Sequence, residues 1–380
     1  AIISYQTAFL KTYYPKEFIA ASMTMDISNQ NKLSEFYEEL KRLNVEVVRP
    51  DINECFADFR TIDDKFYYAL GGIKAVGFEA ISNIVIERTL NGKFESIDDF
   101  ISRVNPKDIN KLQLEGLVKA GAFDKLNSNR QSLFESIPVM IAKSKNIFEN
   151  KSANQIDLFS EYEIVQDDIL LKTEDWKFEE RLSKEFEAVG FFISDHPLNQ
   201  FKEIYDDYKI TDYSNFISNE NLKDSNISAT LLKVQERKTA KGNSYAVLKL
   251  TDLSSVFELF VFSDVLELNR EILKEGSSLI LTLFKNISND ENRLTRINVQ
   301  KIASLKELFK SPINEVLFDI KSKKQIEEIS AILKDEGKTI ININLVDGDN
   351  TLKFKLKNAR KLDRKSLNLL RNQEIQAIIY

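Results

Sequence analysis

The sequence has very little cysteine and histidine. Among its 380 residues there are one cysteine, Cys55, and one histidine, His196. A single cysteine excludes a disulfide within the chain and fits a reducing compartment, so we expect a cytoplasmic protein. These two residues cannot supply a Cys/His zinc site, and we interpret His196, which precedes a proline, as a hydrogen-bonded structural residue. We therefore predict no metal ligands, no cofactor and no catalytic residue in this chain.

Long apolar runs are also missing. No stretch approaches the roughly 18 apolar residues of a membrane span, and no signal peptide opens the sequence, so we expect no membrane partner. The composition, 43% hydrophobic and 29% charged, is that of a soluble globular protein. The length of 380 residues is enough for about two to four domains. The chain starts at Ala1, inside a helical pattern, which suggests a piece of a longer protein.

The net charge of −6 hides a regional imbalance. Residues 151–200 carry five Lys or Arg against twelve Asp or Glu, whereas residues 351–380 carry eight against two. The sign of the charge in each region, rather than the net charge, determines whether a charged partner is attracted there. The basic C-terminal segment could meet DNA or an acidic partner, although a solvated charged face is the usual explanation for such a run.

Helical spacing dominates residues 1–55, which we assign to one helical region. Apolar residues predict a helix over 4–24 that breaks at Pro15. Ser28 is predicted to cap a second helix that runs through Leu43. A short strand is expected at 45–48, before the turn at Pro50.

Two glycine-containing turns follow in residues 56–141, which we interpret as a tandem helix-hairpin-helix region. Free amide groups at a helix N-terminus can bind a phosphate without any side chain, and such elements grip the DNA backbone regardless of sequence. The alternative is that both glycines simply cap helices. The predicted DNA contacts are Lys74, Val76 and Gly77 in the first turn and Lys119 and Gly121 in the second.

Periodicity fades over residues 142–175, which we interpret as a linker. It contains the motif NQIDLF, residues 154–159, in which Leu158 and Phe159 are adjacent large apolar side chains. Such a pair in a loop suits a short peptide that docks into an apolar groove of a partner. The alternative is that both side chains fold back onto their own domain. A helical connector, beginning with a helix over 176–189, is predicted for residues 176–225.

Residues 226–302 show five strand-like runs at barrel spacing, over 227–234, 244–252, 256–263, 278–284 and 293–302. A helix near 265–273 separates the third run from the fourth, which is typical of a five-stranded oligonucleotide-binding (OB) barrel. A basic first loop and an aromatic residue on the next strand suit a single nucleic-acid strand. The alternative is a barrel that binds protein or nothing. The predicted contacts are Arg237, Lys238, Lys241, Tyr245 and Lys249.

Residues 312–380 are predicted to form a small α/β domain in the order βαββαβ, which matches a split βαβ fold. The predicted fold class is therefore multidomain α+β. Adjacent acidic residues occur at 63–64, 98–99 and 167–168, but adjacent side chains diverge on a helix or strand. We interpret them as surface or capping residues rather than as catalytic carboxylates.

Five segments in order resemble the C-terminal portion of the alpha subunit of bacterial DNA polymerase III, a C-family replicative polymerase. They are ISYQTAFLKTYYPKEFIAA, FYYALGGIKAVG, INKLQLEGLVKAGAFDKL, GFFISDHPL and KTAKGNSYAVLKLTDLSSVFELFVF. The resemblance covers essentially the whole chain and is less specific over 303–380. It departs from the family at Ala75, where a hairpin glycine is usual, and at Asp195, which replaces a glycine. The departure at Ala75 puts the phosphate geometry of the first hairpin in doubt.

The resemblance implies several partners. Residues Gln155, Asp157, Leu158 and Phe159 would bind the beta sliding clamp, the hairpins would hold duplex DNA, and the barrel would meet the single-stranded template. The terminal domain would contact the tau subunit of the clamp loader. The remainder of the alpha subunit would carry the palm domain, whose carboxylates hold Mg²⁺.

We therefore expect a non-catalytic, DNA- and clamp-binding part of a DNA-directed DNA polymerase. The alternatives are a stand-alone nucleic-acid-binding or scaffold protein and, ranked lower, a paralogue of the error-prone type.

Overall fold

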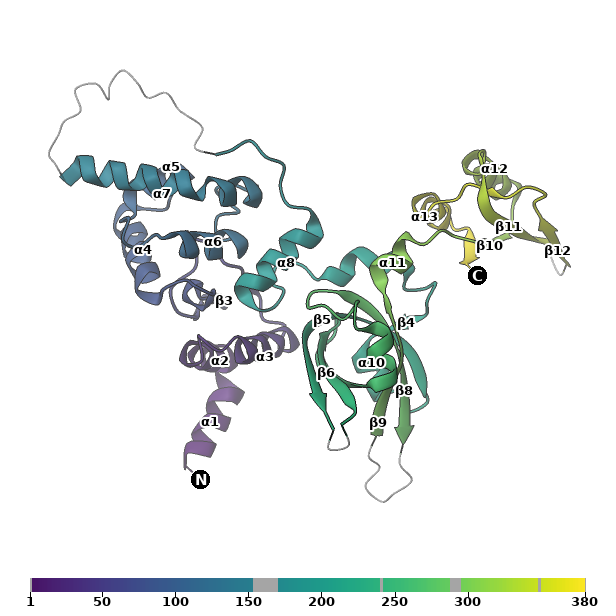
Figure 1. The fold of residues 1–380 in the computed structure, drawn as a ribbon, viewed down its shortest axis with the longest axis horizontal. Coiled ribbons are helices and arrows are strands. Elements are labelled where there is room, and N and C mark those ends of the chain that lie inside the picture. Colours follow the sequence, from purple (N-terminus) through teal and green to yellow (C-terminus); the bar gives the residue numbers. More distant parts are fainter. Residues whose placement is uncertain (1, 153–169, 240–241, 288–294, 348–349, 380) are drawn as a thin grey trace. The chain divides into compact units, whose positions relative to one another are not determined.

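The computed structural model describes two compact units, one comprising residues 1–197 and the other residues 198–380 (Figure 1). The first unit is mainly helical, and the second contains two larger sheets with their own helices. The predicted multidomain α+β class is confirmed. The described residues are 2–152, 170–239, 242–287, 295–347 and 350–379.

Helices in the first unit begin and end close to the predicted positions. The chain breaks at Pro15, which begins α2 because its ring suits the first turn of a helix. Helix α3 is capped by Asn29, whose Oδ1 accepts from Lys32 N at 3.3 Å, rather than by the predicted Ser28. The helices are α1 (Ile2–Tyr13), α2 (Pro15–Met25), α3 (Gln30–Arg42), η1 (Leu70–Gly72), α4 (Phe78–Asn91), α5 (Ile97–Arg103), α6 (Lys111–Lys119), α7 (Arg130–Ser152) and α8 (Phe178–Val189).

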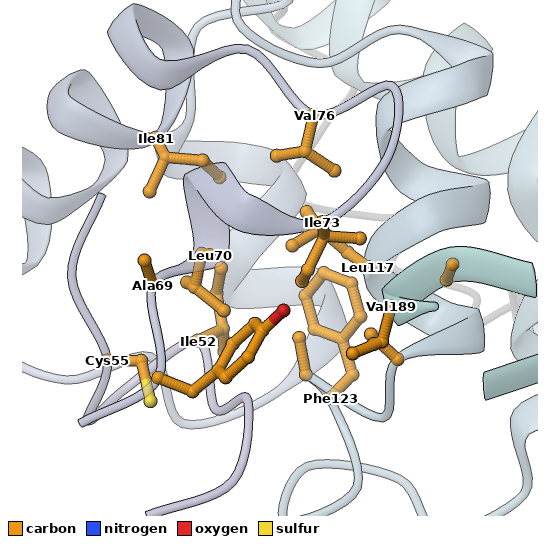
Figure 2. Close-up of a cluster of buried hydrophobic side chains, with 14 of the residues drawn as sticks. Ile52, Cys55, Ala69, Leu70, Ile73, Val76, Ile81, Leu117, Phe123 and Val189 are labelled. Atoms are coloured by element: carbon orange, nitrogen blue, oxygen red, sulfur yellow. The ribbon is translucent and has the colours of Figure 1, made fainter. Parts of the chain in front are cut away.

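A small sheet lies beside these helices in the order β1-β3-β2. Its strands are β1 (Val47–Val48), β2 (Arg60–Ile62) and β3 (Lys65–Tyr67). The strand expected at 45–48 is therefore present, shortened to two residues. The core of the unit is continuous, and Figure 2 shows the part of it that Leu70, Leu117 and Val189 share.

Helix α7 is longer than expected, because residues 142–152 continue the helix instead of starting the linker. Tertiary contacts hold this extension where the apolar pattern has faded. Ser144 is fully buried, and Lys143 Nζ lies 2.9 Å from Asp98 Oδ1 on α5. The docking motif at 154–159 lies outside the described residues.

The first sheet of the second unit contains all five predicted strands, in the order β7-β6-β5-β8-β9. A sixth strand, β4, pairs with β5 in parallel and was too short to predict from a pattern. The elements are η2 (Pro197–Ile204), β4 (Ile210–Thr211), α9 (Tyr213–Ser218), β5 (Asp224–Lys238), β6 (Ser244–Thr251), β7 (Val256–Phe262), α10 (Ser263–Asn269), β8 (Ser278–Ile287), β9 (Thr295–Ser304) and α11 (Leu305–Lys310).

Strand β5 is the common partner of both halves of this sheet. Its first part, residues 224–230, pairs with β8, and its second part, residues 230–238, pairs with β6. The register shifts between Leu231 and Lys233, where the strand passes from one neighbour to the other. Alternate residues such as Ile227 and Ala229 point into the core.

The C-terminal domain follows the predicted βαββαβ order, but its sheet is not a split βαβ unit. Strands β10 and β11 pair directly in parallel, and the sheet order is β12-β11-β10-β13. The β11–β12 hairpin places β12 outside β11, so that no strand separates β10 from β11. The elements are β10 (Glu315–Ile320), α12 (Lys323–Ile332), β11 (Glu336–Asp347), β12 (Asn350–Lys355), α13 (Arg364–Asn372) and β13 (Gln376–Ile379).

Candidate nucleic-acid interface

The first hairpin connects η1 to α4 and is anchored from inside. The side chains of Ile73 and Val76 are buried and lie close to that of Leu117 (Figure 2). The backbone N–H of Lys74 donates to Ala188 O at 2.9 Å. Lys74 and Gly77 are exposed, whereas Val76 points inward, so a DNA contact at Val76 would come from its backbone.

Helix α4 begins at this hairpin without a side-chain cap. Gly77 is its N-cap residue, with φ −79° and ψ 132°, and has no side chain to bond the first turn. The first amide groups of a helix have no partner inside the helix, so they suit a phosphate oxygen. Glu79 in the same turn adds a negative charge that a phosphate would have to tolerate.

Ala75 adopts the conformation that the family resemblance assigns to a glycine. Its φ is +62°, in the left-handed region, which costs an alanine roughly 1–2 kcal/mol. Two backbone hydrogen bonds hold the loop in this path, from Lys74 N to Ala188 O at 2.9 Å and from Val76 N to Ile73 O at 3.2 Å. The hairpin therefore keeps a left-handed turn despite the substitution.

The second hairpin is explained by helix capping. Gly121, with φ +81°, follows the end of α6, where Ala122 N donates to Leu117 O at 2.9 Å and Gly121 N to Val118 O at 3.0 Å. These two bonds form a Schellman motif, which favours glycine at this position. Lys119 lies 3.0 Å from Glu187 in an ion pair. DNA contacts at Lys119 and Gly121 remain predictions.

A buried arginine covers Gly121. Arg130 is 2% exposed, and its Nε donates to Asp124 Oδ1 at 2.8 Å while its Nη1 donates to Lys119 O at 2.9 Å. Nη1 also lies 3.5 Å from Oε2 of Glu185, which is itself buried. A Cβ on Gly121 would collide with the Arg130 guanidinium. The network ties α6, α7 and α8 together.

The amide groups at the start of α7 are already bonded to side chains. Ser132 N donates to Asn129 Oδ1 at 2.9 Å, and Gln131 N donates to Asp175 Oδ1 at 3.1 Å. The Asp175 carboxylate thus occupies a place that a phosphate would need. Of the two helix starts that follow the hairpin turns, α4 is the better suited to an anion.

The sheet that contains β5 to β9 presents aromatic rings on its exposed face. Cross-strand pairing places Tyr245 of β6 between Arg237 of β5 and Phe262 of β7. Phe260 is 49% exposed and Phe262 is 58% exposed, and the ring centroids of Tyr245 and Phe260 are 6.4 Å apart. Lys249 lies on the same face of β6. We call Tyr245, Phe260 and Phe262 the aromatic platform.

Sequence reasoning identified Tyr245 but missed Phe260 and Phe262. Strand β7 buries Phe257, Leu259 and Val261 on one face and exposes Glu258, Phe260 and Phe262 on the other, so Phe260 and Phe262 are as apolar as the buried set. A strict period of two would have separated the two sets. Lys238 is exposed beside the platform, and Lys241 lies outside the described residues.

Comparison with known proteins places the chain in a family. A family model described as a helix-hairpin-helix motif matches residues 44–133. The DNA polymerase III subunit alpha of Borreliella burgdorferi is 33% identical over 321 residues, which is 83% of this chain and 28% of that protein. The chain is homologous to the C-terminal portion of the DNA polymerase III alpha subunit.

Other alpha subunits of DNA polymerase III match to a similar extent. That of Campylobacter jejuni is 33% identical over 285 residues, 72% of this chain and 23% of the relative. That of Rickettsia bellii is 30% identical over 381 residues, 90% of this chain and 32% of the relative. The chain thus spans about a quarter to a third of the length of these polymerase subunits, and a stand-alone module is not favoured.

The described residues of this polymerase III alpha homologue contain no group of three or more His, Cys, Asp or Glu side chains that could hold a metal ion. His196 packs edge-on against Phe192, with ring centroids 5.7 Å apart. Burial and the nearby charge of Lys41 lower the pKa of His196 to about 4, which fits the structural role expected for it. None of the helices in the described segments is both long and apolar enough to cross a membrane.

Proposed function

We propose that this chain is the DNA- and clamp-binding part of a replicative DNA-directed DNA polymerase and contributes its processivity. The helix-hairpin-helix match and the names of the relatives support this role. The observation that carries the DNA-binding part is the aromatic platform, with Arg237 and Lys249 on the same face. Duplex DNA would bind the first hairpin, and single-stranded template would bind the platform. This role implies a cytoplasmic location.

The sheet that carries the platform has the features of an OB barrel. Its five main strands follow the order β7-β6-β5-β8-β9, and α10 lies between β7 and β8 in the sequence. In such barrels the face of the second and third strands binds oligonucleotides. Strands β6 and β7 are the second and third here, and they carry all three rings of the platform.

Replacing Tyr245 and Phe260 by alanine in the full chain is expected to weaken binding of single-stranded DNA about 10- to 100-fold. Base–aromatic stacking is worth roughly 1–3 kcal/mol per base. The measurement is fluorescence anisotropy with a labelled single-stranded oligonucleotide. Since only a handful of phosphates would be contacted, wild-type affinity should also fall with salt, at a logarithmic slope of about −3 to −5.

The matched control is Leu268→Ala on α10, because Leu268 is an 86% exposed apolar residue outside the aromatic platform. It should leave the affinity unchanged. Equal losses in both variants, or an affinity that does not vary with salt, would show that the platform is not a nucleic-acid surface.

The clamp-binding proposal rests on the motif of Gln155, Asp157, Leu158 and Phe159. Burying both apolar side chains could contribute roughly 3–6 kcal/mol before ordering costs. Replacing Leu158 and Phe159 by alanine is therefore expected to abolish binding to the sliding clamp of the same organism, measured by calorimetric titration. Replacing Ile164 and Val165, an apolar pair in the same segment, is the control and should not weaken it. Unchanged clamp affinity after the first substitution would refute the assignment.

The remaining partners are proposed from homology together with one surface. Helix α1 has no buried residue, and Ile2, Ile3 and Tyr5 are each more than 70% exposed. An apolar helix in this state supports packing against the remainder of the alpha subunit, which would supply the Mg²⁺-dependent chemistry. The C-terminal domain, residues 312–380, would contact the tau subunit of the clamp loader.

A further inference from the structure

The sheet of the C-terminal domain has one covered face and one open face. Helices α12 and α13 contribute Ile329, Leu333, Leu367 and Leu370 to the core on one side. Alternate residues of the strands point to the other side. Cross-strand pairing aligns them in two rows, Lys355–Asn342–Leu317 and Lys353–Asn344–Asp319.

Two lysines, Lys353 and Lys355, lie on the edge strand β12 at this open face, and a third, Lys357, follows two residues beyond the end of the strand. Lys353, Lys355 and Lys357 are exposed and alternate with Phe354 and Leu356. No ion pair involves them in the part of the chain that the structure describes. Within β12, Lys353 and Lys355 are alternate residues and so about 6.5–7 Å apart, a spacing comparable with that of neighbouring phosphates in an extended strand of nucleic acid. We call these residues the lysine row.

An open cleft of about 440 Å³ adjoins the lysine row. Glu315, Leu317, Asn342 and Asn344 line it together with Lys353 and Lys355. Asn342 Nδ2 donates to Glu315 Oε1 at 2.6 Å, and Asn344 Nδ2 donates to Asp319 Oδ1 at 2.8 Å. These bonds engage the side-chain N–H groups of the two asparagines, so the asparagine Oδ1 atoms and the second carboxylate oxygens can still accept hydrogen bonds. The cleft therefore offers acceptors above an apolar floor at Leu317.

We propose that this open face binds single-stranded nucleic acid, with phosphates along the lysine row and a base in the cleft. Edge lysines alone could simply protect a strand from pairing with another chain, but that role requires no cleft. An acidic peptide would meet the carboxylates of Glu315 and Asp319 beside the lysines. A nucleobase instead brings amino groups, which carboxylate and amide oxygens accept. This site is separate from the aromatic platform and does not require the proposed polymerase role.

The test uses the full chain with Tyr245→Ala and Phe260→Ala, so that the platform does not mask the second site. Adding Lys353→Glu, Lys355→Glu and Lys357→Glu is expected to weaken oligonucleotide binding about tenfold or more and to reduce the logarithmic salt slope by about 2. The matched control carries Lys321→Glu, Lys323→Glu and Lys324→Glu. It makes the same charge change at exposed positions, and it should change affinity less than about twofold because these positions lie outside the lysine row and the cleft lining. Circular dichroism checks the fold of both.

Two further measurements separate the alternatives. An oligonucleotide with abasic sites should bind the platform-deficient chain at least about threefold more weakly than its parent, because the cleft would lose its base. Equal affinity for the abasic and the parent oligonucleotide would show that no base binds in the cleft. Equal losses of affinity in the two lysine variants would show that the lysine row is not a binding site. Competition by polyglutamate as strong as that by the oligonucleotide would assign the face to acidic peptides. Loss of all binding in the platform variant alone would overturn this proposal while supporting the function proposed above.

Discussion

Replacing Arg130 by methionine is expected to lower the free energy of unfolding of the first unit by about 3–5 kcal/mol. Removing one partner of a buried ion pair leaves the other charge without compensation, and here Glu185 is only 1% exposed. Glu185 Oε1 would still accept from Ile193 N and Ser194 N, both at 2.8 Å. The Lys119 carbonyl at the end of α6 would lose its Arg130 donor, so the helix end would be weakened as well.

Urea unfolding followed by tryptophan fluorescence measures this effect directly. Trp176 is the single tryptophan of the chain, is 8% exposed and packs on Phe134 in the same unit. The matched control is Arg181→Met. Arg181 also pairs with Asp124, at 2.9 Å, but its side chain is 28% exposed, and partly exposed pairs contribute roughly 1 kcal/mol or less. Similar decreases in the free energy of unfolding from the two substitutions would show that the burial of Arg130 does not determine its contribution to stability.

Gly121→Ala is expected to destabilise the first unit by roughly 2–5 kcal/mol, whereas Gly92→Ala should cost only about 1–2 kcal/mol. Both glycines have positive φ, +81° and +86°, so both substitutions carry the strain of a left-handed alanine. A Cβ at Gly92 meets nothing within 4 Å, but one at Gly121 meets the Arg130 guanidinium. The difference between the two variants therefore measures the collision, which overpacking data put at roughly 1–3 kcal/mol.

A double substitution tests the cause of that difference. In the Arg130→Met background the guanidinium is absent and the Asp124 carboxylate, whose Oδ2 lies 2.9 Å from the added Cβ, loses its Arg130 donors and can move. The added cost of Gly121→Ala should therefore fall toward that of Gly92→Ala. Residues in contact show such non-additivity, whereas distant sites add within about 0.5 kcal/mol. Full additivity, measured by the same urea titrations, would mean that the strain at Gly121 has another origin.

Local patterns predicted the elements well, because one buried face leaves a regular signature in the sequence. The β10 strand over 315–320 and the break at Pro15 are examples. Strand β4 has only two residues, which is too few for any period to be visible. The direct pairing of β10 with β11 depends on hydrogen bonds between segments that are distant in the sequence. Those bonds leave no local signal.

The candidate site was harder to predict, since exposure matters there more than periodicity. Phe260 and Phe262 are as apolar as the buried residues with which they alternate, and their exposure is known only once β6 has paired with β7. Asp175 bonds to the start of α7 from a position 44 residues away. The sequence around Gly121 alone therefore does not reveal that an amide group at the start of α7 already donates to a distant carboxylate.

The double pairing of β5 has a consequence for how the sheet that carries the aromatic platform opens. One strand is hydrogen-bonded to β8 along its first part and to β6 along its second, so β5 joins two separately paired halves of the sheet that meet at Thr230. Amide hydrogens of β5 that donate to these neighbours would then exchange with solvent only when the half of the sheet that holds them opens. A surface built on such a strand is ordered before a ligand arrives, so that association costs little backbone entropy.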